Sequence, residues 1–433
     1  MSKPARRLLY LSFFLVFIIL APLFIAYSLG YRYRLDTNMI EKNGAFYIKS
    51  YPRDADIYIN QGASGHQTPD QITEVRPGNY LLTVQKESYS PWQKELKVYA
   101  GETTFAEDIV LFFSDLKKTP LGPGAYNRSS NKEKNKYAYV DQKSNELFVT
   151  DLEQGKNHQI YTFKADYTLG PWSPDDQKIL LNLNNAHFIF DLNQKNIRPL
   201  ETIRADKIIW DSKDSQLLWF LNDHKLYTYN LIEPSERALN TVALDETIND
   251  FVLYGDYLLL QYGDEEKPEQ NFLAQLNKNN LQEIQKVPLD NLGKINLLLA
   301  DEQRFILTLG SAVYIKNQDR EPITIANTLA DLHDERLLLS NGHEIILYNF
   351  QDDWQQLIDR STQIVSELLW HPNGSYFLTE INGRTNITEI DGRDKRNTIN
   401  ILDNPLKKSY IFNKKGDKLF VLTPEENFYL TIQ

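Results

Sequence analysis

The chain has 433 residues, a formal net charge of −11 and an aromatic share of 12%. This length is sufficient for two or three domains, and the aromatic share favours β-structure. The negative charge argues against binding to nucleic-acid phosphates, which requires basic surfaces. The sequence has no cysteine, which excludes disulfides, cysteine-ligated zinc, thiol catalysis and lipid attachment through cysteine.

The first predicted element is a transmembrane helix over residues 8–31. This run lies between Arg7 and Arg32 and contains no charged side chain. Roughly 24 residues in a helix extend about 36 Å, which is enough to cross a hydrocarbon core of about 30 Å. Three tyrosines lie where the aromatic belt of a membrane interface is expected: Tyr27, Tyr31 and Tyr33.

The basic residues on the two sides of this run indicate its orientation. Lys3, Arg6 and Arg7 precede it with the α-amino group, and Arg32 and Arg34 follow it. The N-terminal excess predicts a single-pass protein of the cell membrane, with a cytoplasmic tail of residues 1–7 and an extracytoplasmic chain over residues 32–433. The alternative is a signal peptide cleaved at Ala26-Tyr27-Ser28. Such peptides have an apolar region of about 7–15 residues, so the longer run here favours a retained anchor.

After a linker of residues 32–43, residues 44–114 are predicted to form a small β-sandwich. Apolar side chains alternate along short segments separated by turn-forming residues, which is the pattern of half-buried strands. The alternating positions are Ile57 and Ile59, then Tyr80, Leu82 and Val84, then Leu96 and Val98.

A series of motifs runs in order through this segment. They are Gly44, Ile48-Lys49-Ser50-Tyr51-Pro52, Ala55-Asp56-Ile57-Tyr58-Ile59-Asn60, Gly62, Thr68-Pro69, Pro77-Gly78-x-Tyr80 and Tyr89-Ser90-Pro91-Trp92. Their order resembles the PEGA domain, a small β-sandwich of bacterial and archaeal surface proteins. The resemblance implies a structural or adhesive spacer rather than a catalytic domain. We expect Trp92 to lie in the core, and an exposed stacking platform is the alternative.

Two positions depart from the family pattern. The tetrapeptide that gives the family its name is here Pro52-Arg53-Asp54-Ala55. Ser88 stands where the family usually has a glycine, before the tyrosine of the Tyr-x-Pro-Trp motif. Because a residue with a Cβ atom is strained at positive φ, we expect the turn at Ser88 to be remodelled.

From about residue 120 to the C-terminus, a unit of about 40 residues recurs, which is the length of a four-stranded propeller blade. In the clearest copy, Trp172-Ser173-Pro174-Asp175 opens a turn before the apolar segments 178–183 and 186–192. Other copies start near Trp210, Trp370 and Phe412 and, less regularly, near Tyr126, Phe251, Leu297 and Asp331. The Trp-Ser-Pro-Asp turn resembles the WD40-like repeat of TolB-type propellers.

These repeats predict a β-propeller over residues 116–433, with about eight four-stranded blades or, as the alternative, seven. A single blade cannot bury both of its faces, so the blades are expected to stack in a ring. The last copy has only three predicted strands, and we expect residues 116–121 to add the fourth and to remove the open edge. The predicted fold class is therefore mainly β, with one N-terminal transmembrane helix, a PEGA-type sandwich and a propeller.

No residue is predicted to be catalytic, cofactor-binding or metal-binding. The sequence lacks the G-x-S-x-G motif of α/β-hydrolases, a phosphate-binding glycine loop and an EF-hand loop. His333 and His343 are the closest pair of histidines, and their spacing matches no metal-ligand motif. Paired carboxylates for glycoside hydrolysis stay open, because distance in space defines them. Polar loops such as residues 263–268 are predicted to be exposed tips that offer contact surfaces.

We expect a membrane-anchored binding or scaffold protein whose propeller contacts a protein or glycan of the cell envelope. We expect no cofactor, no nucleic-acid partner and no enzyme activity, and residues 8–31 have the lipid bilayer as their partner. One alternative is an enzyme that acts on envelope glycans or peptides at the propeller funnel, which rests on analogy of fold alone. The other alternative is a mechanical component of a surface layer.

Overall fold

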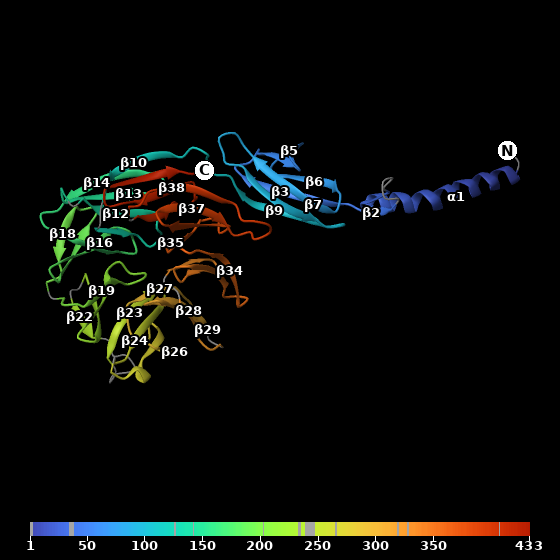
Figure 1. Cartoon of the computed structure of the whole chain (residues 1–433). Helices are drawn as coiled ribbons and strands as arrows, with labels where there is room; N and C mark the ends of the chain where they lie inside the picture. Colours follow the sequence, from blue (N-terminus) through green and yellow to red (C-terminus); the bar gives the residue numbers. More distant parts are fainter. Residues whose placement is uncertain are drawn as a thin grey trace. The chain divides into compact units, whose positions relative to one another are not determined.

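The computed structural model describes residues 3–33, 39–124, 127–141, 143–201, 203–232, 235–238, 247–264, 266–317, 320–326, 329–406 and 408–433. The predictions that concern Arg34, Tyr126 and Glu265 lie outside these residues. The chain divides into two compact units, and Figure 1 labels many of their elements. The first unit contains Met1–Leu116, Thr388–Ile399 and Gln433. The second contains Lys117–Ile387 and Asn400–Ile432.

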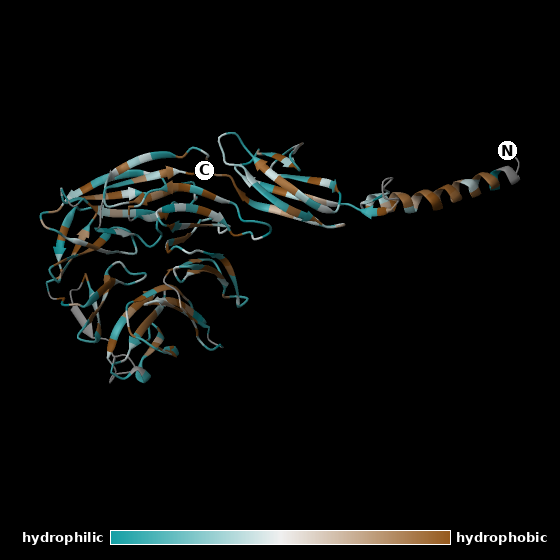
Figure 2. Cartoon of the chain, viewed as in Figure 1, coloured by the Kyte–Doolittle hydropathy of each residue, from teal (hydrophilic) through white to brown (hydrophobic). Residues whose placement is uncertain are grey.

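The first unit begins with helix α1 (Lys3–Ser28). Within it, Arg6–Ser28 is long and apolar enough to cross a membrane, judged by length and composition, and its apolar side chains are not buried against the protein. Figure 2 shows hydrophobic residues along most of this helix. The predicted N-terminal apolar helix is therefore confirmed, and it ends at Ser28 rather than at the predicted residue 31.

The strands after the helix form two sheets that face each other across one core. The three-stranded sheet has the order β6 (Asp70–Val75), β3 (Gly44–Tyr51), β9 (Thr103–Val110). The four-stranded sheet has the order β5 (Gly62–Gln67), β4 (Asp56–Ile59), β7 (Gly78–Gln85), β8 (Trp92–Val98). The alternating positions Ile57, Leu82, Val84, Leu96 and Val98 all lie in the core. Trp92 is 4% exposed, which confirms its predicted core position.

The two turns that depart from the family pattern both keep positive φ. Asp54 has a φ of 58° and Ser88 a φ of 71°. The expected remodelling at Ser88 is therefore wrong. The physical reason is that neighbouring backbone holds this turn: Ser114 N–H donates to the Ser88 carbonyl (3.0 Å), and Ser90 N–H donates to the Phe112 carbonyl (2.8 Å).

The residues between the helix and the sandwich are partly structured. β1 (Tyr31–Tyr33), which begins at the last residue of the predicted membrane span, pairs antiparallel with β2 (Ile40–Lys42) of the predicted linker. The Asn43 N–H then donates to the Gly30 carbonyl at 2.9 Å. The chain that leaves α1 is thus hydrogen-bonded to the chain that enters β3.

In the second unit, the described residues form eight four-stranded sheets. Seven of them follow the chain: β11–β14 (Asn127–Ser130, Lys136–Val140, Glu146–Asp151, Lys156–Thr162), β15–β18 (Thr168–Trp172, Lys178–Leu183, Ala186–Asp191, Asn196–Pro199), β19–β22 (Lys207–Trp210, Leu217–Asn222, Lys225–Asn230, Ser235–Ala238), β23–β26 (Ile248–Tyr254, Tyr257–Tyr262, Phe272–Asn277, Glu283–Pro288), β27–β30 (Ile295–Ala300, Arg304–Leu309, Ala312–Asn317, Ile323–Ala326), β31–β34 (Leu329–His333, Arg336–Ser340, Glu344–Asn349, Trp354–Arg360) and β35–β38 (Val365–Trp370, Tyr376–Ile381, Arg384–Glu389, Thr398–Asp403). A short 3₁₀-helix η1 (Pro268–Gln270) lies between β24 and β25.

The eighth sheet joins the two ends of the propeller. Its strands are β39 (Ser409–Phe412), β40 (Lys418–Leu422), β41 (Glu426–Thr431) and β10 (Lys117–Pro123). β10 pairs antiparallel with β41, from Lys117 opposite Thr431 to Pro123 opposite Glu426. This pairing confirms the prediction that the segment before the first repeat completes the last sheet, which leaves no open edge there. The predicted mainly-β propeller fold is confirmed, and the number of blades in its ring stays a prediction.

The cores of the second unit lie between neighbouring sheets. One cluster combines residues of β20 and β21 with residues of β23, β24 and β25. Another combines residues of β24 and β25 with residues of β28 and β29. Each sheet therefore buries its faces against its neighbours, as the propeller prediction requires.

A buried polar residue follows the first strand of five of these sheets: Asn131, Ser173, Asp211, His371 and Asn413. Ser173 Oγ accepts a hydrogen bond from Lys178 N–H at 2.9 Å. The Oδ1 atoms of Asn131 and Asn413 accept the corresponding bonds from Lys136 and Lys418, both at 2.9 Å. In these three copies the hydrogen bond is kept, although the accepting residue is serine in one and asparagine in two.

Candidate functional site

The second unit carries a cleft of about 1270 Å³ at one edge of three consecutive sheets, β19–β22, β23–β26 and β27–β30. Its walls come from the starts of β19, β23 and β27, the ends of β20 and β24, and the turns beside them. The lining residues that matter below are Lys207, His224, Asp250, Gln261, Asp264 and Lys294.

Asp250 joins the three sheets at this edge. Its Oδ1 atom accepts hydrogen bonds from Lys207 Nζ (2.6 Å) on β19 and from Phe251 N–H (2.8 Å) on β23. Its Oδ2 atom accepts a hydrogen bond from Ile295 N–H (2.7 Å) on β27. Both carboxylate oxygens are thus occupied by the protein, and Asp250 shapes the cleft rather than offering a free reactive group.

Other polar side chains of the cleft also hold its walls. His224 Nδ1 lies 3.1 Å from the Ile248 carbonyl oxygen. Thr247 Oγ1 and Asn249 Nδ2 both donate to the Gly263 carbonyl at 2.7 Å. These bonds connect the β20–β21 turn and the β24–β25 loop to the start of β23.

Two side-chain donors of residues that line the cleft have no partner among the described residues. Gln261 is 1% exposed, and its Oε1 atom accepts a hydrogen bond from Gly293 N–H at 3.2 Å. Its Nε2 donor is buried and has no hydrogen-bond partner in the described part of the chain. Lys294 also lines the cleft, and its side chain has no hydrogen-bond or ion-pair partner among the described residues. A buried unpaired donor costs about 1–3 kcal/mol, so an acceptor that reaches Gln261 gains that amount.

The charged groups around these donors indicate which functional groups a ligand of the cleft would have. The carboxylates of Asp206, Asp264 and Glu266 line the same cleft as Lys294. A ligand that presents acceptors to Gln261 and Lys294 and donors to the carboxylates fits this arrangement. Peptides and polyhydroxylated or amino sugars have both kinds of group.

The predicted contact loop of residues 263–268 lies between two hollows. Gly263, Asp264 and Glu266 line the cleft described above. Gly263 and Asp264 also line a second hollow of about 720 Å³, together with Lys267 and Lys286. The use of the loop of residues 263–268 as a contact surface stays a prediction.

The structure does not bring His333 and His343 into one site. The His333 ring lies 5.7 Å from the Trp370 ring, whereas His343 Nδ1 lies 3.3 Å from the Ser361 carbonyl oxygen. Among the described residues, no group of three or more His, Cys, Asp or Glu side chains is placed to hold a metal ion.

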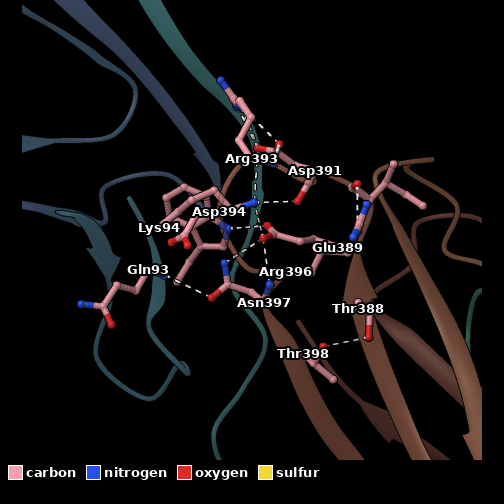
Figure 3. Close-up of polar contacts among 12 residues, drawn as sticks. Gln93, Lys94, Thr388, Glu389, Asp391, Arg393, Asp394, Arg396, Asn397 and Thr398 are labelled. Atoms are coloured by element: carbon pink, nitrogen blue, oxygen red, sulfur yellow. Dashed lines mark hydrogen bonds and ion pairs between the residues drawn. The ribbon is translucent and has the colours of Figure 1, made fainter. Parts of the chain in front are cut away.

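The first unit contains a charged cluster around Lys94, drawn in Figure 3. Lys94 lies on β8 and its side chain is fully buried. Its Nζ atom lies 2.5 Å from Glu389 Oε1 and 3.4 Å from Asp391 Oδ2, and it donates to the Asp391 carbonyl at 2.8 Å. Both acidic residues belong to the segment Thr388–Ile399, which is part of this unit.

Glu389 is fully hydrogen-bonded in this cluster. Its Oε2 atom accepts a hydrogen bond from Trp92 Nε1 at 2.7 Å. Its Oε1 atom accepts two from Asn397, from the backbone N–H at 2.8 Å and from Nδ2 at 2.9 Å. Buried ions are tolerated when they are paired and hydrogen-bonded in this way.

The same segment covers the edge of the four-stranded sheet of the sandwich. β8 is the last strand of that sheet, so its outward N–H groups lack a strand partner. Gln93 N–H donates to Asn397 Oδ1 (3.3 Å), and Glu95 N–H donates to Asp394 Oδ2 (2.9 Å). Side chains of Thr388–Ile399 therefore take the place of a neighbouring strand and block edge-to-edge pairing.

Asp391 is one of the groups of this cluster whose pKa is displaced, together with Asp394, whose pKa is lowered, and Arg393, whose pKa is raised. Burial alone would raise the pKa of Asp391, but hydrogen bonds from Arg393 and the charge of Lys94 outweigh burial, and the pKa lies below its ordinary value. Arg393 binds it through Nε and Nη2, with Nη2 2.8 Å from Asp391 Oδ2. Asp391 is therefore ionised at neutral pH.

Neither the residues that line the cleft nor the cluster around Lys94 was predicted from the sequence. Trp92 and Glu389 are 297 positions apart, and no local pattern connects them. Lys207 and Asp250 are 43 positions apart and Asp250 and Ile295 are 45 apart, which is close to the repeat length. A comparison of charged residues at equivalent positions of successive repeats would have indicated this second set.

Residues 43–107 match the family model of the PEGA domain. The sandwich is a PEGA domain. This match covers the strands from β3 to β8 and most of β9. No match was found among the curated proteins.

Among solved structures, the matches are β-propellers. The crystal structure of the C-terminal WD40 domain of Sif2 has 12% sequence identity and a TM-score of 0.51, and the match covers 73% of this chain and 98% of that chain. The structure of the Dos1 propeller has 12% identity and a TM-score of 0.49, and the match covers 73% and 94%. The crystal structure of Porphyromonas gingivalis dipeptidyl peptidase 4 has 11% identity and a TM-score of 0.47, over 70% and 56%. At these identities the similarity concerns the fold alone.

Proposed function

We propose that this PEGA-domain propeller protein is anchored in the membrane by α1 and binds an envelope protein or glycan through the cleft of its second unit. The polar lining of that cleft carries the proposal, in particular Lys294 and the Nε2 donor of Gln261, which has no hydrogen-bond partner in the described part of the chain. Membrane attachment is supported by the length and composition of Arg6–Ser28. The excess of basic residues before the apolar run of residues 8–31 supports an extracytoplasmic location for the PEGA domain and the propeller.

We also propose that the cleft binds its partner without catalysis. Two side chains of the cleft that could transfer protons, Asp250 and His224, are within hydrogen-bond distance of backbone groups of the walls. Turnover of envelope glycans or peptides by the purified full-length protein would contradict this and would favour the enzyme alternative.

Site-specific photocrosslinking in intact cells tests the binding proposal. A photoreactive residue at Glu266 lies in the cleft, and one at Glu283 is a matched exposed control on β26. We expect one protein or glycan to be captured from position 266 and not from position 283. Loss of that product in a Gln261→Leu variant would assign the contact to the cleft. Equal capture, or none, at the two positions would contradict the proposal.

A further inference from the structure

The end of the PEGA domain next to α1 carries a group of exposed apolar and aromatic side chains. They are Tyr31, Tyr33, Met39, Ile40 and Tyr99. Four of them flank or belong to the β1–β2 pair, and Tyr99 follows β8 in the sandwich itself. We refer to these five residues as the collar.

A series of backbone hydrogen bonds places the collar at the end of α1. The helix ends with Gly30 N–H donating to the Tyr27 carbonyl at 3.1 Å. Asn43 N–H donates to the Gly30 carbonyl (2.9 Å), and Gly101 N–H donates to the Asn43 carbonyl (3.0 Å). The loop that carries Tyr99 is therefore only two hydrogen bonds away from the helix terminus.

Gly44 shows how closely this loop approaches the start of β3. A Cβ atom at Gly44 would lie 2.4 Å from the Tyr99 carbonyl oxygen, closer than side-chain atoms come to backbone. Only glycine fits there, so the close packing of Tyr99 on the entry to β3 is built into the sequence. The same glycine opens the series of family motifs.

Arg32 strengthens the same junction. Its Nη1 atom donates to the Tyr27 carbonyl (2.7 Å) and the Tyr31 carbonyl (3.0 Å), and its guanidinium lies 3.7 Å from the centre of the Tyr27 ring. It also pairs with Glu74 on β6. A cation is favourable at the C-terminus of a helix, and here it joins the helix end to the sandwich.

We infer that the collar lies in the interfacial layer of the bilayer that α1 crosses, so that this end of the PEGA domain rests on the lipid surface. The inference depends on the proposed membrane anchoring of α1. Tyrosine is enriched at membrane interfaces because its ring prefers the headgroup region. Lys97 Nζ lies 4.8 Å from the Tyr99 ring centre, and a lysine so placed keeps its ammonium in water or on phosphates while its stem lies along the ring.

The absence of cysteine permits a direct test, since any introduced cysteine is unique. The full-length protein would be reconstituted in vesicles of phosphatidylcholine and phosphatidylglycerol, with a fluorophore on Tyr33→Cys, Ile40→Cys or Tyr99→Cys. Tyr51→Cys is the matched control, because Tyr51 is an equally exposed tyrosine at the opposite end of β3. Quenching by lipids brominated near the headgroup reports the proximity of each label to the interface.

We expect quenching at positions 33, 40 and 99 to be at least threefold stronger than at position 51. A label on Phe17→Cys in the middle of α1 separates the two proposals. If lipids brominated deep in the acyl chain quench position 17 strongly, but positions 99 and 51 are quenched equally, the interfacial location of the collar is overturned and the membrane anchor is not. Absence of quenching at position 17 would overturn the membrane anchor on which the collar depends.

Discussion

Two ion pairs of this protein, one in each unit, differ in how they are enclosed. Lys94 and Glu389 in the first unit are both almost completely buried. In the second unit, Asp250 is buried, but the Lys207 side chain remains 23% exposed at the cleft. Asp250 also has two backbone donors that remain if the lysine is lost. In the enclosed pair, the buried carboxylate depends on the lysine for its stabilisation. At the cleft, backbone N–H groups and water can stabilise the carboxylate if the lysine is lost.

The largest expected effect follows from breaking the enclosed pair. Lys94→Ala leaves Glu389 buried without its cation, which is expected to lower the free energy of unfolding of the first unit by about 3–5 kcal/mol. Urea denaturation of the full-length protein measures this loss of stability, and hydrogen exchange of the β8 amides assigns it to the first unit. Lys97→Ala on the same strand is the exposed control. If the two variants have the same stability, the pair does not hold this unit.

A double substitution sharpens the same result. Lys94→Met with Glu389→Leu removes both charges and keeps apolar volume, so we expect a smaller loss than for Lys94→Ala alone. A loss equal to or larger than that of the single variant would show that the geometry of the segment Thr388–Ile399, and not the charge balance, determines the stability.

Removal of the lysine from the pair at the cleft is expected to destabilise the protein less than removal of Lys94. Lys207→Ala should cost about 1–3 kcal/mol, because Asp250 keeps its bonds to the N–H groups of Phe251 and Ile295. Lys225→Ala, on the exposed start of β21, is the control for a surface lysine. Thermal denaturation of both variants gives the comparison. A loss for Lys207→Ala as large as for Lys94→Ala would remove the distinction between the two pairs.

The first unit can also be stabilised without touching its charges. Ser88 has a φ of 71°, and Ser88→Gly is expected to raise the free energy of unfolding by about 1 kcal/mol because glycine adopts this conformation without strain. Asp54→Gly should gain less, because aspartate tolerates positive φ better than serine. Ser88→Ala serves as the control and should show no gain. Denaturation midpoints that do not differ between the glycine and alanine variants would contradict strain at this turn.

The smallest expected effect is on the pH dependence of the stability of the first unit. The pKa of Asp391 is lowered in the folded protein, so ionised Asp391 stabilises the first unit above the unfolded pKa of about 4. That contribution is lost as the pH falls through the lower folded pKa. Stability measured between pH 6 and pH 2.5 should fall less steeply in Asp391→Asn than in the unchanged protein. Parallel curves would show that Asp391 does not contribute.

Much of the fold was predictable because it depends on local periodicity. The alternation at Ile57, Leu82 and Val84 predicted strands whose apolar sides now form the sandwich core. The repeat length and the missing fourth strand of the last copy predicted the pairing of β10 with β41. The turn at Ser88 was predicted wrongly, because its strain is offset by backbone hydrogen bonds to residues 112–114, which no local pattern shows.

The sequence by itself determined an apolar N-terminal helix, a PEGA domain and a propeller of four-stranded sheets, since run length, alternation and repeat spacing are local properties. Tertiary structure alone decided that Lys94 is paired with Glu389, that Asp250 joins three sheets, and that the Nε2 donor of Gln261 has no partner among the described residues. Each of these depends on distances between atoms that are far apart along the chain. A charged residue has the same local signature whether it is solvated or buried in a pair, and only the fold distinguishes the two.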